Sequence, residues 1–236
     1  RLIGYADGIS VSNRFLQKKF QGVLLPHCRD TTILDPMKFD SDKIKEKMGF
    51  QNKRVVMFLG TPRPHKGLDD LLEAFKKIKA SNLKLVIIGV ENQQKFLNKV
   101  DLSIRESVVV LPKTPFQKLP ELLSIADIIA IPQRQTSDSV GQIPARLFDA
   151  MSMAKPIIAT RVSDIPEVLD GCGYLVDPNN PSQLVNSIQY ILNNSDEARV
   201  KGDAARERCR KKYDIHNLES GLSGLIEQVT AKKVNC

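Results

Sequence analysis

Five short apolar runs divide the chain into regular segments, and this pattern restricts its fold more than any other feature. They are 55–60 (VVMFLG), 83–89 (LKLVIIG), 107–111 (SVVVL), 127–131 (DIIAI) and 156–160 (PIIAT). Segments with helical spacing lie between them, such as Leu68, Leu71 and Phe75. This alternation is typical of βαβ units, and continuously apolar strands are covered on both faces. The sequence therefore predicts an α/β fold with a doubly wound parallel sheet, Rossmann-like in type.

The rest of the sequence pattern predicts one more strand, several helices and a division of the chain into a short N-terminal segment and one large domain. A sixth strand is expected at 173–177, and helices are expected at 91–100, 120–125, 143–154, from Asn180-Pro181 onward, at 196–211 and at 217–230. Before them, a strand, a helix and a strand within residues 9–25 are too small to bury a core alone. We therefore expect residues 1–27 to be a remnant of an N-terminal domain with a linker, and residues 28–236 to be the Rossmann-like domain.

Composition excludes several classes of protein. Hydrophobic residues make up 42% of the chain and charged residues 26%, which argues against disorder. The longest apolar runs have about five residues, whereas a spanning helix needs ~20, so no membrane crossing is predicted. The N-terminus does not resemble a signal peptide. The cysteines at 28, 172, 209 and 236 form no C-x-x-C pair and, with three histidines, predict reduced thiols, a cytoplasmic protein and no metal site.

The net charge of +8 favours anionic partners, namely nucleotides, nucleic acid or an acidic lipid surface, although solubility alone also explains it. Trp is absent and aromatic residues make up 6%, so we expect no nucleic-acid partner. The basic cluster at 206–213 (RERCRKKY) is interpreted as a solvated helix face, with docking on anionic lipid as the alternative. The chain is thus expected to be cytoplasmic, or peripheral on the inner face of a membrane.

The first candidate site is GTPRPHKG at 60–67, between a strand and a helix. Ligands of doubly wound sheets bind at this end of the strands. Gly60 permits close backbone approach, the following helix offers free N–H groups, and Arg63 and Lys66 supply two cations. Together they suit a diphosphate. The alternative is a proline-rich turn with two solvated cations, and His65 is interpreted as a solvated turn residue.

The second candidate site lies within 137–160, where backbone amides near Gly141–Ile143 are expected at a helix start. Arg146 and Asp149 are three residues apart and so share a helix face. Two interpretations stay open. Arg146 faces a phosphate while Asp149 accepts hydrogen bonds from two ribose hydroxyls, or the two residues form an ordinary ion pair.

The ordered blocks GTPRPHKGLDDLLEAF, LKLVIIG, ELLSIADIIAIP, PARLFDAMSMAKPIIATRVSDIPEVL and GYLVDPNNPSQL carry a resemblance. The chain resembles the C-terminal, donor-binding domain of GT-B glycosyltransferases of the large retaining family four. The resemblance covers nearly all of residues 23–230, and the segment before it is similar to the end of that family's N-terminal domain. It implies transfer of a hexose, with retention and without a metal or cofactor, from a nucleotide-diphosphate sugar.

The resemblance also implies roles for individual residues. Arg63 and Lys66 match the catalytic cations that stabilise the departing diphosphate. Asp149 matches the second acid of an E-x7-E motif, which holds the ribose. Residues 139–143 match the segment whose amides contact the phosphates and donor sugar, and 111–114 match the segment that lines the base. The expected donor-binding residues are therefore Gly60, Thr61, Arg63, Lys66, Pro112, Lys113, Gly141, Gln142, Ile143, Arg146 and Asp149.

The sequence departs from the family pattern at two acidic positions. Gly141 stands where the first acid of E-x7-E is expected, and the second acid is Asp149 rather than Glu. Gln142 and Asp138 are candidates to replace the first acid. PARLFD is closer to members with a P-x-K/R-L-x-E pattern. No role is assigned to His27 or Cys28, and Glu167 is interpreted as structural rather than donor-binding.

The favoured function is the donor-binding half of a glycosyltransferase, which binds its donor but transfers inefficiently without an acceptor-binding N-terminal domain. UDP-linked donors are favoured over GDP-linked ones, and the acceptor is expected to be a glycan or a lipid-linked molecule. Two alternatives remain. One is a non-catalytic nucleotide-sugar-binding or assembly module, and the other is a nucleotide-sugar epimerase on the same fold.

Overall fold

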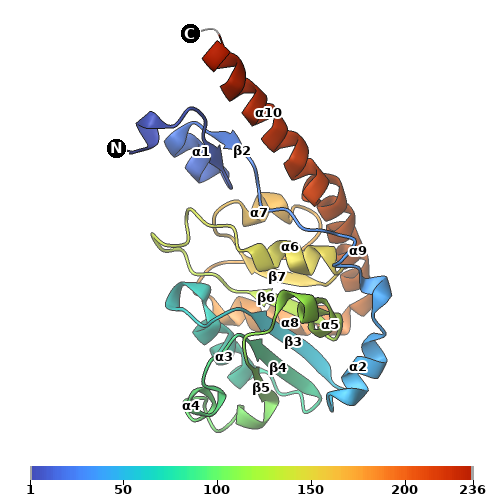
Figure 1. The fold of residues 1–236 in the computed structure, drawn as a ribbon. Coiled ribbons are helices and arrows are strands. Elements are labelled where there is room, and N and C mark those ends of the chain that lie inside the picture. Colours follow the sequence, from blue (N-terminus) through green and yellow to red (C-terminus); the bar gives the residue numbers. More distant parts are fainter. Residues whose placement is uncertain (1, 235–236) are drawn as a thin grey trace.

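The computed structural model describes residues 2–234 and contains two parallel sheets (Figure 1). The larger sheet has the strand order β5-β4-β3-β6-β7-β8. Its strands are β3 (Arg54–Leu59), β4 (Leu83–Ile88), β5 (Val108–Leu111), β6 (Ile128–Ile131), β7 (Ile157–Thr160) and β8 (Tyr174–Val176). The chain order reverses between β3 and β6, because β3 pairs with both β4 and β6. The predicted doubly wound parallel sheet is confirmed, and its switch point lies beside Leu59 and Ile131.

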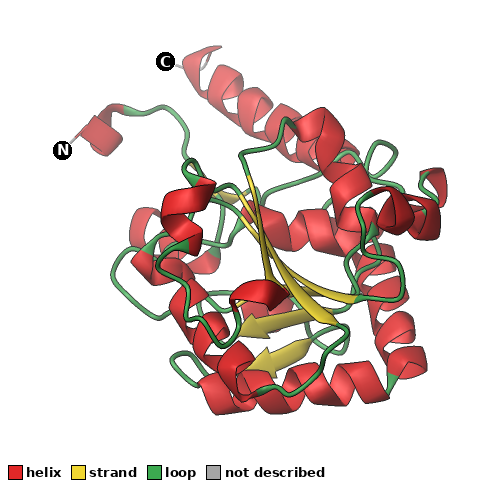
Figure 2. Ribbon diagram, turned by 90° about the horizontal axis from the view of Figure 1, so that it is seen from below, coloured by secondary structure: helices red, strands yellow, loops and turns green. Residues whose placement is uncertain are grey.

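Helices cover both faces of this sheet (Figure 2). They are α2 (Ser41–Lys47), α3 (Leu68–Lys77), α4 (Gln93–Leu97), α5 (Leu119–Ser124), α6 (Ala145–Ser152), α7 (Ile165–Val168), α8 (Pro181–Asn193) and α9 (Ser195–Lys212). Alternate residues of each central strand point to opposite faces. Val55 and Met57 of β3 therefore pack with α5, α6 and α9, while Val56 and Phe58 pack with α3 and α8.

A strand–helix–strand unit precedes the larger sheet. It consists of β1 (Ser10–Val11), α1 (Arg14–Phe20) and β2 (Val23–Leu24), with the two strands paired in parallel. Asn13 caps α1, since its side-chain oxygen accepts from the amide of Leu16 at 2.8 Å. We call residues 2–25 the N-terminal unit. Its two strands and α1 were predicted, whereas its 3-10 helix (Leu2–Tyr5) was not, and Figure 1 shows the unit apart from the larger sheet.

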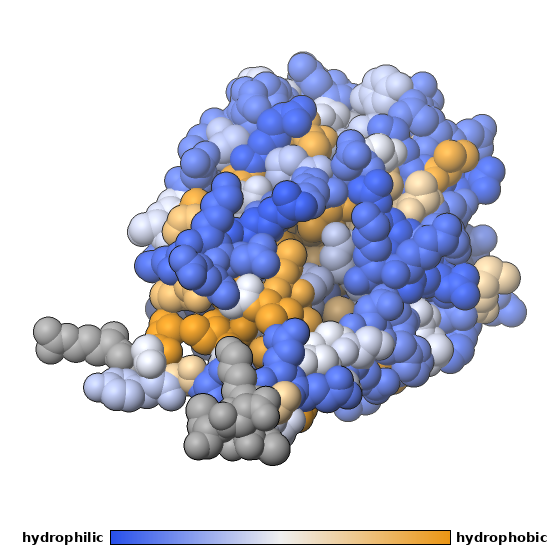
Figure 3. Space-filling view, turned by 90° about the horizontal axis from the view of Figure 1, so that it is seen from above, coloured by the Kyte–Doolittle hydropathy of each residue, from blue (hydrophilic) through white to orange (hydrophobic). Residues whose placement is uncertain are grey.

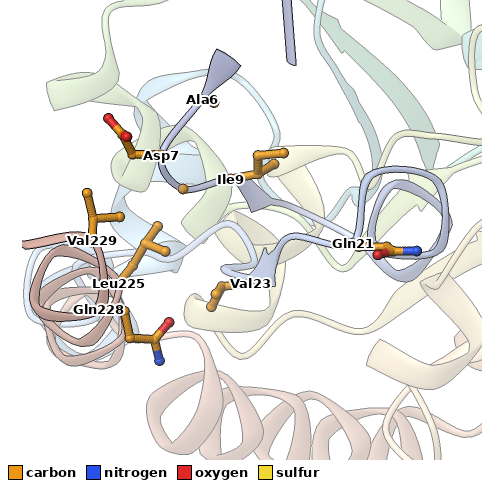
Figure 4. A pocket seen from close by; sticks show the side chains of 9 residues that line it. Ala6, Asp7, Ile9, Gln21, Val23, Leu225, Gln228 and Val229 are labelled. Atoms are coloured by element: carbon orange, nitrogen blue, oxygen red, sulfur yellow. The ribbon is translucent and has the colours of Figure 1, made fainter. Parts of the chain in front are cut away.

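The last helix, α10 (Ile215–Val234), runs from the end of α9 back along the N-terminal unit (Figure 1). A Cβ added to Gly8 would lie 2.8 Å from a methyl group of Val229, so the two segments pack closely. Between them is a cavity of about 240 Å³, seen in Figure 4, whose labelled lining includes Ile9, Val23 and Leu225. Figure 3 shows hydrophobic side chains gathered beside the two chain ends. Exposed apolar residues of these elements include Ile3, Phe15, Leu222 and Ile226.

The structure corrects some predicted details. The helix expected from Ile143 begins at Ala145, because Pro144 has extended backbone (ψ 127°) at the N-cap. Helices α2 and α7 were not predicted.

Cys28, Cys172 and Cys209 are free thiols, and Cys236 lies outside the described residues. No helix in residues 2–234 has the length and apolar character needed to cross a bilayer.

Candidate functional site

A cavity of about 280 Å³ opens at the switch point of the larger sheet. Residues from the ends of β3 and β6, the loop before α3 and the start of α6 line it. They are Leu59, Gly60, His65, Lys66, Gln133, Gln142, Pro144, Ala145, Arg146 and Asp149. Five of the residues expected to bind the donor are therefore brought together. These are Gly60, Lys66, Gln142, Arg146 and Asp149.

Arg146 is the most unusual of these side chains, because the residue is only 7% exposed and its guanidinium forms no ion pair with any residue that the structure describes. Its Nη1 donates to the carbonyl oxygen of Leu59 at 2.6 Å, and its Cζ lies 4.8 Å from the centre of the Phe58 ring. Its Nε and Nη2 are buried and have no hydrogen-bond partner in the described chain. Burial lowers the pKa of Arg146 to about 10, so the group is still charged at neutral pH. Unpartnered buried donors carry a desolvation cost that a bound anion would relieve.

Lys66 lies on the same side of the cavity. A Cβ on Gly60 would be 3.0 Å from Lys66 Nζ and 3.5 Å from Arg146 Nη1, so both cations converge over this glycine. Burial, followed by the charges of Arg146 and Arg63, lowers the pKa of Lys66 to about 8. Two neighbouring cations that raise each other's energy attract an anion. This arrangement favours a phosphate or diphosphate over Gly60.

Backbone geometry at the strand ends makes room for this arrangement. Gly60 and Gly89 have φ values of 111° and 105°, in a region that glycine adopts readily. A Cβ on Gly89 would lie 2.8 Å from the carbonyl carbon of Gly60, so the loops after β3 and β4 touch through their backbones. Both glycines thereby keep the carboxyl edge of the sheet open to a ligand.

The loop after β6 is fixed by contacts that the sequence did not reveal. The side chain of Gln133 is buried, and its Nε2 donates to the carbonyl oxygens of Ser139 (3.3 Å) and Gln142 (3.4 Å). Arg134 forms a bidentate ion pair with Asp70 on α3, at 2.8 and 2.7 Å. Gln133 lines the cavity, so it is a candidate residue that the sequence analysis missed. Its position directly after an apolar strand was the available signal.

Several expected site residues lie outside the cavity wall. Thr61, Pro112, Lys113, Gly141 and Ile143 are absent from its lining. Arg63 is exposed, although its charge acts on Lys66. The donor-binding roles of Arg63 and of these five residues stay predictions. His65, interpreted above as a solvated turn residue, is half-buried and lines the cavity.

The expected N-terminal amides are placed differently from the prediction. A 3-10 turn (Pro64–Lys66) separates β3 from α3, and residues of the α3 first turn do not line the cavity. The amide of Gln142, three residues before α6 begins, donates to the carbonyl oxygen of Ser139 at 3.0 Å. The cations of the cavity wall are the side chains of Lys66 and Arg146, and a role for the backbone amides stays a prediction.

Arg146 and Asp149 do not form the ordinary ion pair that was one interpretation. Asp149 accepts a hydrogen bond from Nε of Arg29, in the segment that links the N-terminal unit to α2. Burial raises the pKa of Asp149, while Arg29 acts in the opposite direction. Glu167 forms an ion pair with Arg14 of α1 at 2.5 Å, away from the cavity.

Comparisons with known proteins agree with this fold. Residues 40–208 match the family model described as glycosyl transferases group 1. A GDP-mannose-dependent alpha-(1-6)-phosphatidylinositol monomannoside mannosyltransferase of Mycolicibacterium smegmatis is 26% identical over 94% of this chain and 62% of its own length. A D-inositol 3-phosphate glycosyltransferase of Acidothermus cellulolyticus is 24% identical over 99% of this chain and 57% of its own. The chain thus spans about three-fifths of the length of these two relatives.

Solved structures show the same fold. The Anabaena protein HepE in complex with UDP superposes with a TM-score of 0.82 at 16% identity, covering 94% of this chain and 64% of that one. The C-terminal domain of a glycosyl transferase group 1 protein from Francisella tularensis superposes with a TM-score of 0.66 at 19% identity, covering 79% and 99%. The family match covers well over half of the sequence, and the chain belongs to the group 1 glycosyltransferases, with their GT-B, Rossmann-like architecture.

Proposed function

We propose that this chain is the donor-binding half of a retaining glycosyltransferase and holds the diphosphate of a nucleotide sugar over Gly60. The observation that carries the proposal is Arg146, a buried guanidinium with two unpartnered nitrogens beside a second cation, Lys66. A diphosphate supplies the acceptor oxygens and the negative charge that both groups lack.

The proposed chemistry follows from where charge develops. As the bond from the sugar to the diphosphate breaks, its electron pair passes to the phosphate oxygen. Lys66, Arg146 and the nearby Arg63 stabilise that charge without a metal. Asp149, which retains acceptor capacity beyond its bond from Arg29, would accept hydrogen bonds from the ribose hydroxyls. Pro112 and Lys113 follow β5 at the same edge of the sheet and would line the base.

Transfer to an acceptor is proposed to need a further domain packed on the N-terminal unit and α10. Apolar side chains such as Phe15 and Ile226 are exposed there. The acceptor is a glycan or a lipid-linked molecule, in keeping with the relative that is named a phosphatidylinositol monomannoside mannosyltransferase. The chain alone would then bind donor with little transfer. We propose that the protein acts in the cytoplasm, including at the inner face of a membrane.

UDP is the first nucleotide to test, because the structural relative HepE was solved with it, and GDP is the second. Calorimetric titration without added metal would compare UDP, GDP and ADP for the unmodified chain and the Lys66→Ala variant. We expect one nucleotide to bind and its affinity to fall at least about tenfold (~1.4 kcal/mol) in the variant.

Lys79→Ala is the matched control, since it removes the same charge from an exposed position two residues beyond α3. Its affinity should equal that of the unmodified chain. Failure of all three nucleotides to bind, or equal losses in both lysine variants, would contradict the proposed function.

A further inference from the structure

Arg29 contacts a residue of the candidate site from outside the cavity. Its Nε donates to Oδ1 of Asp149, while the cavity lining includes Asp149 but not Arg29. Both side chains are largely buried, at 19% and 7% exposure. A buried pair of this kind is costly to break, because removal of one partner leaves an uncompensated charge. Arg29 thus neutralises a cavity-wall carboxylate without entering the cavity.

The position of Arg29 is determined by the opposite end of the chain. Its amide donates to the carbonyl oxygen of Tyr213 at 2.8 Å, and its own carbonyl oxygen accepts from the amide of Ile215 at 3.0 Å. Its Nη1 donates to the carbonyl oxygen of Cys28 at 2.8 Å. The backbone of Arg29 is therefore anchored by the junction between α9 and α10, and its guanidinium is held by the carbonyl oxygen of Cys28 as well as by Asp149.

Without Arg29, Asp149 is left one helical turn from Arg146, a cation with no ion pair among the described residues. The two residues lie three apart on α6, where side chains are neighbours, and both line the cavity. Arg146 still has two buried nitrogens without a partner. Without its bond from Arg29, the Asp149 carboxylate would accept charge-assisted hydrogen bonds from Nε and Nη2 of Arg146. A diphosphate in the cavity would need the same two donors.

We propose that Arg29 is a positioning residue for the donor site, which keeps Asp149 away from Arg146 so that the Arg146 guanidinium stays available to an anion. This inference rests on the proposed function and adds a specific residue to it. Arg29 does not contact the diphosphate. It acts by holding the Asp149 carboxylate, which would otherwise compete with the diphosphate for Arg146.

A double-mutant cycle tests the proposal with inorganic pyrophosphate, which carries the anion but neither base nor ribose. Four proteins are titrated calorimetrically: the unmodified chain, Arg29→Leu, Asp149→Asn and the double variant. We expect Arg29→Leu to weaken pyrophosphate binding about tenfold (~1.4 kcal/mol), and Asp149→Asn to change it less than about twofold. In the double variant the affinity should return to within about twofold of the unmodified chain, since no carboxylate remains to compete.

A purely long-range effect of charge gives a different pattern. Asp149→Asn would then strengthen binding by the same factor whether Arg29 is present or not, and this result would overturn the proposal. Arg29→Lys, which keeps the charge and can still pair with Asp149, should bind pyrophosphate within about threefold of the unmodified chain. A loss as large as that of Arg29→Leu would also contradict it.

Arg29→Leu leaves the buried Asp149 carboxylate unpaired, which destabilises the fold. A second comparison within the cycle therefore avoids this variant. Asp149→Asn and the double variant differ only at position 29 and contain no buried charge at 149. The proposal predicts equal pyrophosphate affinity for these two proteins, whereas direct contact of Arg29 with the anion predicts about a tenfold difference. If the unmodified chain binds neither pyrophosphate nor a nucleotide, the anion site and this inference both fail; if it binds but the cycle is additive, only the role of Arg29 fails.

Discussion

The side-chain amide of Asn13 donates to the carbonyl oxygen of Gly141 at 2.6 Å and thereby joins the N-terminal unit to the loop before α6. Asn13 is completely buried in this contact and also caps α1. The next turn of α1 covers the same glycine, since a Cβ on Gly141 would lie 3.3 Å from the Phe15 ring. Position 141, where the family pattern has an acid, is therefore packed beneath α1.

Replacing Gly141 with the expected acid should disturb this contact. In Gly141→Glu, the Cβ alone would lie 3.3 Å from the Phe15 ring, closer than ordinary contact, and we expect the unfolding free energy to fall by about 1–3 kcal/mol through overpacking. Urea denaturation measures the loss, and amide exchange should increase in α1. Gly224→Ala in α10 is the control, because a Cβ there meets nothing within 4 Å. An unchanged urea midpoint for Gly141→Glu would show that α1 does not hold this loop.

Nucleotide binding should weaken as pH rises above about 8. Burial, Arg146 and Arg63 lower the pKa of Lys66 to about 8 in the empty site, and a bound diphosphate would raise it again by favouring the charged form. Above pH 8 binding must therefore take up a proton, and affinity should fall by up to about tenfold per pH unit. Below pH 7 Lys66 is already charged and its contribution is constant.

Titrations between pH 7 and 9.5, in buffers with different ionisation enthalpies, would measure this proton uptake. The Lys66→Ala variant should show neither the uptake nor the loss of affinity over that range. A pH profile that is the same in both proteins would assign the titration to another group.

Gly67 should tolerate substitution far less than Gly49, although both have left-handed backbone (φ 68° and 72°). A Cβ on Gly67 would overlap the carbonyl oxygen of Pro132, whereas a Cβ on Gly49 meets nothing within 4 Å. We expect Gly49→Ala to cost about 1–2 kcal/mol from the backbone alone. Gly67→Ala should cost more than about 3 kcal/mol, because the loops after β3 and β6 must also move apart. Equal melting temperatures for the two variants would contradict this difference.

The ion pair between Arg134 and Asp70 should contribute strongly to stability. Arg134→Leu leaves the buried Asp70 carboxylate without its bidentate partner, which costs about 3 kcal/mol at such sites. The control is Arg199→Leu, whose pair with Asp203 is exposed and 3.8 Å long, with an expected change below about 1 kcal/mol. Urea denaturation of both variants measures the two losses. Similar losses would mean that burial does not distinguish the two pairs.

Much of the fold was predictable because apolar strands and helices have different periodicities. Each predicted strand of the larger sheet is present within about two residues of its expected ends. Helix α2 was missed because Ile44 is its only buried side chain, so it has almost no apolar period. The expected start of α6 at Ile143 was two residues early, since the extended backbone at Pro144 delays the helix.

The candidate site was predictable only where it follows strand ends. Lys66, Arg146 and Asp149 converge because parallel strands deliver their loops to one edge of the sheet. The partner of Asp149 was not predictable, because Arg29 is 120 residues away and local spacing favoured Arg146. Tertiary packing decides such pairings, and no periodic signal records them.

The chain crosses from the N-terminal unit to the larger domain near Arg29, and at the start of α10 it turns back to run along that unit. These two segments are hydrogen-bonded to each other, through the bridge between Arg29 and Asp214. Because Arg29 also donates to Asp149, its side chain connects this junction between the two ends of the chain to the wall of the cavity.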